Sequence, residues 1–305
     1  MKWFGAKAGA YRSVGLEIGS EGLAFAVVER ARGKLPRLLH AEYIAEATAP
    51  DKRLRERLGE LRCLNLPCRA LLANGQYQFL LADAPDVPAA ELNDAVRWRI
   101  KDLINIPVAD AVLDTFLLPE NCTRAGNRLV YVAVAKRTTV TKLVAQVATA
   151  GLNLQSIEVP ELALARLADT VADSSRPLAL VNLVSGGGHL VLVHNSELYL
   201  ARHFQLPYHG GLLDDIPADA LLLEIQRSLD YFERQMRQSP PQQLFLTGEN
   251  ISEDKLTDNL RQGLSASIEL LSLGGIIDVD DSVPEHTLSL CMPALGAALN
   301  ESRVK

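Results

Sequence analysis

Two stretches of the chain share one pattern of apolar and polar positions. The first covers residues 14–28 and the second 178–193. In each, an apolar run is followed by glycine and serine and then by a second apolar run. Apolar runs of this length around a turn predict a β-hairpin. Each first arm also holds one polar side chain, Glu17 in one case and Asn182 in the other. The sequence therefore predicts two similar hairpins with a polar residue in matching places.

Shorter signals fill the chain after the first hairpin. They predict a strand at 38–44, a helix at 52–64, and strands at 69–74 and 78–82. The pattern changes at Pro85, because Asp86-Val87-Pro88 is typical of a helix start. The residues beyond it predict a helix at 89–104, strands at 112–118 and 129–135, and a helix at 139–150. We therefore expect a first half at 1–83 and an inserted subdomain at 84–155.

The helix predicted at 89–104 has one apolar face. Its members are Leu92, Val96, Ile100 and Leu103. At about 100° per residue, Trp98 points away from this face, toward the side that carries Asp94 and Lys101. An aromatic side chain in such a place either packs against a neighbouring subdomain or belongs to a binding site.

The rest of the chain contains the second hairpin among further helices and strands. Its elements are a helix at 159–172, the second hairpin, a strand at 198–204, an amphipathic helix at 222–236, a strand at 243–248, a helix at 254–264, a strand at 268–271 and a helix at 294–299. We expect these to form a second half at 156–305. The whole chain is thus predicted to be an α/β protein.

Composition excludes several classes of protein. The 305 residues are 48% hydrophobic and 22% charged, which is typical of a globular chain. A formal net charge of −6 disfavours a nucleic-acid partner. The four cysteines have no metal or redox spacing and are expected to be reduced thiols of a cytoplasmic protein. No run has the roughly 20 apolar residues of a membrane span. Trp3 and Phe4, near two lysines, could touch a membrane surface, although loose packing is the favoured interpretation.

The glycine turns could hold phosphates. Duplicated hairpins of this kind resemble those that face each other across the nucleotide cleft of actin-like and Hsp70-like folds. Candidate phosphate contacts are Gly19 and Ser20 in the first turn and Gly186 and Gly187 in the second. Glu17 is the acidic candidate for a metal ion, but Asn182 contributes no charge. Val184 also restricts the backbone at the second turn, so the phosphate end is weak.

Three residues could form an adenosine end. Glu224 and Arg227 lie three apart on the amphipathic helix, so they project on the same side. Glu224 could accept from ribose hydroxyls and Arg227 could stack on a base, with Gly248 beneath it. A surface ion pair explains Glu224 and Arg227 at least as well.

From residue 14 to residue 299 the chain resembles the PilM-like family of type IV pilus assembly proteins. The more specific segments are 91–98, which contains Trp98, and 224–231, which contains Tyr231. The first turn, at 15–20, resembles the Gly-Ile-Asp-Ile-Gly of the family. The chain departs from the family at Asn182, Val184 and Gly248-Glu249.

This resemblance implies an actin-like fold with two domains, in which the inserted subdomain is of the type found in the division protein FtsA. It also implies a cytoplasmic platform that holds the tail of a PilN-like inner-membrane protein and can bind ATP, without a tightly bound metal. The departures disfavour ATP hydrolysis. We expect a scaffold with Trp98 at or beside the partner site, where the extended tail docks between the inserted subdomain and the first half. Other pilus assembly proteins and a second copy of the chain are further expected partners. The alternatives are an ATPase of the same fold and a protein that polymerises as FtsA does; the oligomeric state stays open.

Overall fold

The computed structural model describes residues 10–45, 49–211 and 213–301, so Trp3 and Phe4 lie outside the described part. Its first sheet has the strand order β15-β3-β2-β1-β4-β9. The strands are β1 (Tyr11–Ile18), β2 (Gly22–Arg30), β3 (Arg37–Ala45), β4 (Pro67–Leu72), β9 (Asn153–Glu158) and β15 (Asp278–Val279). β1 to β3 are antiparallel, and β4 runs parallel to β1. The first hairpin is confirmed, with Gly19 donating its N–H to the Gly22 carbonyl across the turn.

The second sheet repeats this arrangement. Its order is β12-β11-β10-β13-β14, and β13 runs parallel to β10 as β4 does to β1. The strands are β10 (Leu178–Val184), β11 (Gly187–His194), β12 (Glu197–Gln205), β13 (Gln243–Gly248) and β14 (Ser267–Leu270). Both predicted hairpins therefore begin a sheet of the same topology.

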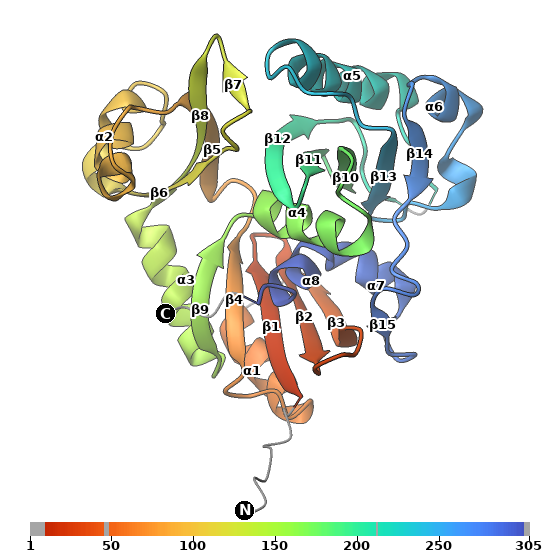
Figure 1. Cartoon of the computed structure of the whole chain (residues 1–305). Coiled ribbons are helices and arrows are strands. Elements are labelled where there is room, and N and C mark those ends of the chain that lie inside the picture. Colours follow the sequence, from red (N-terminus) through yellow and green to blue (C-terminus); the bar gives the residue numbers. More distant parts are fainter. Residues whose placement is uncertain (1–9, 46–48, 212, 302–305) are drawn as a thin grey trace, which may run out of the picture.

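Helices cover both faces of the two sheets. α1 (Pro50–Glu60) and α3 (Arg137–Thr149) bury Leu54, Leu58, Leu143 and Val147 on one face of the first sheet. In the second half, α5 (Ala218–Arg234) contacts β12 and the short α6 (Asp258–Gln262) contacts β14. Between the sheets, α4 (Pro160–Val171) packs on α8 (Met292–Ala298), as Figure 1 shows. The core thus continues from one half into the other.

The end of the chain returns to the first half. β15 pairs with β3, α7 (Glu285–Leu290) contacts β3, and α8 lies against β1, β2 and β4. The expected second half at 156–305 therefore has its last segments built into the first sheet. Small residues permit this packing, because a Cβ on Gly15 would lie 1.8 Å from the Ala294 carbonyl oxygen.

A third sheet forms the inserted part. It has the order β5-β8-β6, with β7 paired to β8. The strands are β5 (Tyr77–Asp83), β6 (Ala111–Leu117), β7 (Thr123–Arg124) and β8 (Asn127–Lys136). The expected limits of 84 and 155 are therefore wrong at both ends. β5, which precedes residue 84, pairs with β8 in this sheet. α3, which precedes residue 155, and β9, which spans it, pack in the first half. The inserted sheet and its connections therefore occupy 77–136.

The predicted helix at 89–104 is shorter in the structure. It consists of a 3₁₀ turn (Ala89–Glu91) and α2 (Leu92–Arg99), after which Leu103 donates its N–H to the Ile100 carbonyl in a tighter turn. Leu92, Val96 and Ile100 are buried against the inserted sheet, whereas Leu103 is exposed. Two further 3₁₀ turns lie at Val108–Asp110 and Glu253–Lys255. In place of the helix expected at 254–264, the structure has the 3₁₀ turn at Glu253–Lys255 followed by α6.

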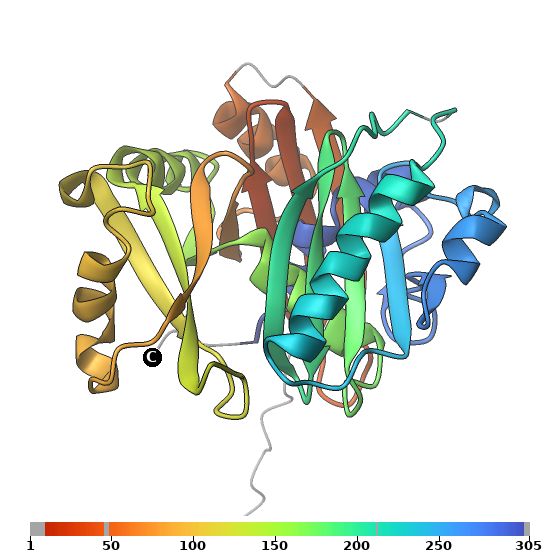
Figure 2. The same cartoon turned by 90° about the horizontal axis from the view of Figure 1, so that it is seen from above.

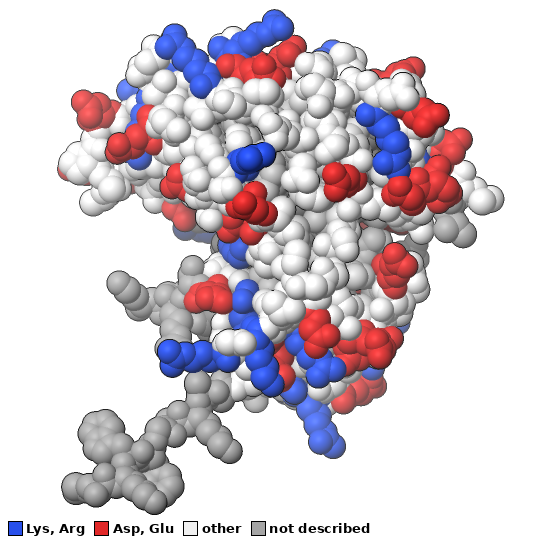
Figure 3. All heavy atoms as spheres, turned by 45° about the vertical axis from the view of Figure 1, so that its right-hand side comes forward, with Lys and Arg blue, Asp and Glu red and all other residues white. Residues whose placement is uncertain are grey.

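Seen from above, the inserted sheet lies on the left and the second half on the right, side by side (Figure 2). On the face drawn in Figure 3, acidic and basic side chains are interspersed rather than gathered into a broad basic area. Within the described ranges, no helix combines the length and the apolar character needed to cross a bilayer.

Candidate interdomain site

A cleft of about 440 Å³ lies between the two halves at the two hairpin turns. We call it the cleft. Its polar lining consists of Glu17, Ser20, Glu21, Tyr43, Asn74, Asn182, Ser185, His189, His209, Glu249 and Ser289. The structure therefore brings together Glu17, Gly19, Ser20 and Asn182, as the duplicated hairpins predict.

Glu17 lies beside two other titratable groups. Burial raises its pKa to about 7; the charge of Glu161 adds to this effect and the charge of His189 opposes it. Burial also pushes the pKa of Glu161 upward, but hydrogen bonds and the charge of His189, together with the Tyr77 hydroxyl, outweigh it and leave that pKa lowered. Tyr77 donates to both Glu161 oxygens, at 2.9 and 2.8 Å.

A row of polar side chains crosses the second sheet behind the cleft. Asn182 is the cross-strand partner of both His189 and Thr247, and His189 is the partner of His203. The two imidazole rings are 4.9 Å apart, and His189 Nδ1 is 3.5 Å from Glu161 Oε1. Asn182, His189 and Thr247 are buried. The row and Glu161 connect the cleft to a second cavity, described below.

The turn glycines do not offer the donors expected for phosphates. Gly19 uses its N–H within its own turn, and Gly186 donates its N–H to the Tyr208 carbonyl at 2.7 Å. Gly187 lies in β11, where a Cβ would be 2.2 Å from the Phe204 carbonyl oxygen. Gly248 serves close packing in the same way, with Leu183 as its neighbour. Three of these four glycines, Gly186, Gly187 and Gly248, lie outside the lining of the cleft.

The cleft does not fit a nucleoside triphosphate. Among the described residues that line it there is no lysine or arginine, whereas Glu17, Glu21 and Glu249 are all present. Phosphate groups need positive charge or free backbone donors. The N–H of Gly19, the turn glycine in this lining, is already bonded to the Gly22 carbonyl, and Gly186 lies outside the lining. Within the described residues, no cluster of three or more acidic, histidine or cysteine side chains could hold a metal ion.

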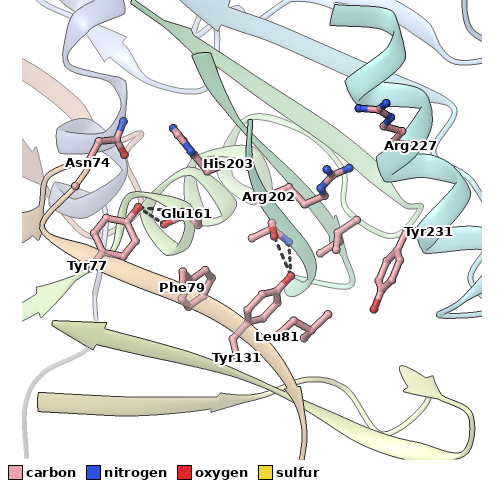
Figure 4. A pocket seen from close by; sticks show the side chains of 13 residues that line it. Asn74, Tyr77, Phe79, Leu81, Tyr131, Glu161, Arg202, His203, Arg227 and Tyr231 are labelled. Carbon is pink, nitrogen blue, oxygen red and sulfur yellow. Dashed lines mark hydrogen bonds between the residues drawn. The ribbon is translucent and has the colours of Figure 1, made fainter. Parts of the chain in front are cut away.

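A second cavity, of about 670 Å³, separates the inserted sheet from the second half. We call it the groove. Its side-chain lining includes Tyr77, Phe79, Leu81, Tyr131, Glu161, Arg202, His203, Arg227 and Tyr231 (Figure 4). β5 and β12, which border it, are both edge strands of their sheets.

Of the three predicted adenosine residues, Arg227 lines the groove, and none of Glu224, Arg227 and Gly248 lines the cleft. Arg227 lines the groove and pairs with Glu224 at 2.6 Å; Glu224 also lies 3.4 Å from Arg202. The ion pair considered from the sequence is therefore present. The helix α5 contacts β12, so Arg227 reaches the groove, and neither Arg227 nor Glu224 lines the cleft that holds Glu17.

One face of the inserted sheet forms the other wall. Phe79 and Tyr131 stack at 4.5 Å, and the Tyr131 hydroxyl bonds to both backbone groups of Ala201 on β12. The opposite face, with Val130 and Val132, packs against α2. Trp98, which is 68% exposed, therefore lies on the far side of this sheet from the groove.

Sequence reasoning missed His189, Glu161 and Tyr77. A usable signal existed for His189, because a hairpin register that pairs it with Asn182 puts two polar residues together among apolar strands. Glu161 stands in the first turn of α4, where an acidic residue also has the ordinary role of favouring the helix dipole.

The sheets, their duplicated order and the cleft between them define an actin-like fold. A search of family models and a search of curated proteins found no match. Among solved structures, the PilM–PilN type IV pilus biogenesis complex contains a chain that is 21% identical and has a TM-score of 0.70. The similarity covers 94% of this chain and 96% of that one.

Two other solved structures resemble this chain over nearly its whole length. The cytoplasmic domain of EpsL, an inner-membrane component of the type II secretion system of Vibrio cholerae, has a TM-score of 0.53 at 11% identity and 97% coverage of both chains. A protein of Bacteroides thetaiotaomicron with an actin-like ATPase fold and unknown function has a TM-score of 0.50 at 11% identity, covering 95% of this chain and 98% of that one. These likenesses establish the actin-like fold.

Proposed function

We propose that this chain is a non-catalytic, cytoplasmic platform protein of a type IV pilus assembly machine. Its partner is the cytoplasmic tail of a PilN-like inner-membrane protein, which keeps it peripheral to the membrane. The observation that carries the proposal is the similarity, over 94% of the chain, to a protein solved in a PilM–PilN complex. The resemblance of segments 91–98 and 224–231 to the PilM-like family adds support, and we favour the mannose-sensitive haemagglutinin (MSHA) pilus system, because the chain resembles its biogenesis protein MshI.

The groove suits an extended peptide. Its two borders, β5 and β12, are edge strands, the kind of strand beside which an extended peptide can add, and its aromatic wall offers apolar contacts. Arg202, Arg227 and His203 on the opposite wall suit an acidic side chain or a carbonyl. We place the tail here, and Trp98 on the far side of the inserted sheet is a separate candidate contact.

Titration of a synthetic tail peptide tests the proposal. The peptide is the N-terminal segment of a PilN-like protein encoded beside this chain, titrated against wild type, Tyr231→Ala and Trp98→Ala. An aromatic anchor contributes enough for its truncation to weaken binding about tenfold or more. Loss in Tyr231→Ala alone supports the groove, and loss in Trp98→Ala alone moves the contact to α2. No binding by wild type would reject the platform function.

An ATPase of the same fold is the second candidate, favoured by the position of Glu17 at the first turn. Phosphoryl transfer needs charge on the phosphates and a metal held by acidic groups, and Asn182 supplies no second carboxylate. We expect no magnesium-dependent phosphate release above a buffer blank. Turnover that disappears in Glu17→Ala would replace the scaffold with an enzyme.

A further inference from the structure

We infer that the cleft is a binding site for a small organic cation that carries primary ammonium groups, and that it does not bind a nucleotide. The inference is independent of the proposed partner tail, which concerns the groove. The cleft occupies the position of a nucleotide cleft in an actin-like fold, but its lining carries negative charge, which does not suit phosphate groups. Glu17, Glu21 and Glu249 line the cleft, and the described lining contains no lysine or arginine to balance them.

The three carboxylates share one neighbourhood. Burial raises the pKa of the Tyr43 phenol, and the charges of Glu21, Glu249 and Glu17 raise it further, so all three act on one side chain of the lining. Burial raises the pKa of Glu249 and the charge of Glu21 adds to this effect. Carboxylates that line one cleft without a lysine or arginine beside them favour a bound cation.

Asn182 is the independent observation. Its side chain is 1% exposed and lines the cleft, yet neither Nδ2 nor Oδ1 has a hydrogen-bond partner among the described residues. A buried amide without partners is costly and is usually satisfied by a ligand or water. An ammonium group donates three hydrogen bonds and accepts none, which matches the Asn182 oxygen and the nearby carboxylates.

Among the described residues, no lysine or arginine lines this place. Lys255 is engaged elsewhere, because its Nζ donates to the Gly211 carbonyl at 3.2 Å and lies over the Tyr208 ring. Tyr208 in turn donates to the backbone carbonyl of Glu249, a residue that lines the cleft. The Tyr43 ring adds an aromatic face of the kind that attracts ammonium groups.

The test is calorimetric titration and thermal denaturation of the full chain with spermidine, and separately with ATP and magnesium, at physiological ionic strength. We expect spermidine to bind and raise the melting temperature, and ATP with magnesium to do neither. Asn182→Leu should weaken spermidine binding about tenfold or more, because a hydrogen bond to a charged group is lost. The same change should raise the melting temperature of the free protein by about 2–4 °C, since it removes a buried amide without partners.

Glu249→Gln is a second test variant. It keeps the shape of the side chain, so it disturbs the packing less than Asn182→Leu does, and it should also weaken spermidine binding. Glu233→Gln on the exposed face of α5 is the charge-matched control and should bind as wild type does. Equal loss in Glu249→Gln and Glu233→Gln would mean general attraction to a chain of net charge −6 and would overturn the site. So would the absence of spermidine binding, or stabilisation by ATP with magnesium that Asn182→Leu removes.

Discussion

Glu17 shows how the cleft can respond to pH. Its pKa is raised from 4.5 to about 7 by burial, against the opposing charge of His189 and with a smaller contribution from Glu161. The folded chain therefore keeps this proton between about pH 4.5 and 7, while the unfolded chain releases it. Because the folded state binds more protons in this window, the contribution of Glu17 to stability falls as the pH rises through it.

Glu17→Gln fixes the neutral form and makes this effect measurable. In urea denaturation we expect the variant to match wild type near pH 5 and to exceed it by about 1–2 kcal/mol at pH 8. Other ionisable groups lie near this place, among them Glu161 with a lowered pKa and Tyr77 with a raised pKa, so the difference between the two proteins is the quantity to follow. A difference that does not change from pH 5 to pH 8 would contradict the raised pKa.

Trp98 can be tested separately for folding and for binding. The side chain is 68% exposed, so Trp98→Ala should change the free energy of unfolding by no more than about 0.5 kcal/mol. If Trp98 anchors a partner, the affinity of that partner falls about tenfold or more. Leu213→Ala removes another exposed apolar side chain and is the control. A folded Trp98→Ala protein with full affinity removes this residue from the interface.

Local sequence predicts some residues of the candidate sites but not where all of them lie in the fold. Glu17 and Asn182 stand out because each interrupts an apolar strand, and the hairpin repeat puts both at the cleft. Glu224 and Arg227 were correctly paired by helical spacing. Their position beside the groove depends on how α5 and the inserted sheet pack, and no local pattern contains that information.

Helices and strands also divide into those that local sequence predicts and those that depend on long-range pairing. Both hairpins and α5 have strong periodicity and appear at the predicted places. β9 is short and half-buried, and its pairing partner β4 lies about 85 residues away, so its pattern alone did not reveal it. The observed limits of the inserted part also differ from the predicted ones, because β5 pairs with β8, which lies far along the sequence, and local patterns do not specify such pairing.

Close packing of α8 on α4 gives a prediction at this scale. A Cβ on Gly296 would lie 2.2 Å from the Ala163 carbonyl oxygen. Gly296→Ala should therefore push the two helices apart and lower the free energy of unfolding by about 1–3 kcal/mol. Gly59→Ala in α1 meets no atom within 4 Å and should be neutral or slightly stabilising. Similar melting temperatures for the two variants would show that α8 can move without cost.

At the scale of the whole molecule, three sheets are held by two different kinds of contact. The first and second sheets share the apolar layer of α4 and α8. The inserted sheet meets the second half at the groove, where the Tyr131 hydroxyl accepts from the Ala201 N–H at 2.7 Å and donates to the Ala201 carbonyl at 3.0 Å. Because β12 is an edge strand, these backbone groups depend on Tyr131 for a partner.

Tyr131→Phe should loosen the inserted sheet from the second half. The ring and its stacking on Phe79 remain, but both Ala201 backbone groups lose their partner, at a cost of about 1–3 kcal/mol. Hydrogen exchange should become faster at the Ala201 amide and stay unchanged at Leu180 in the centre of the sheet. Tyr231→Phe, whose hydroxyl is 3.5 Å from Arg124, is the control and should leave Ala201 protected. Since the groove lies between these surfaces, a tail peptide that binds there should bind Tyr131→Phe more weakly. A folded variant with wild-type protection at Ala201 would show that packing alone sets the width of the groove.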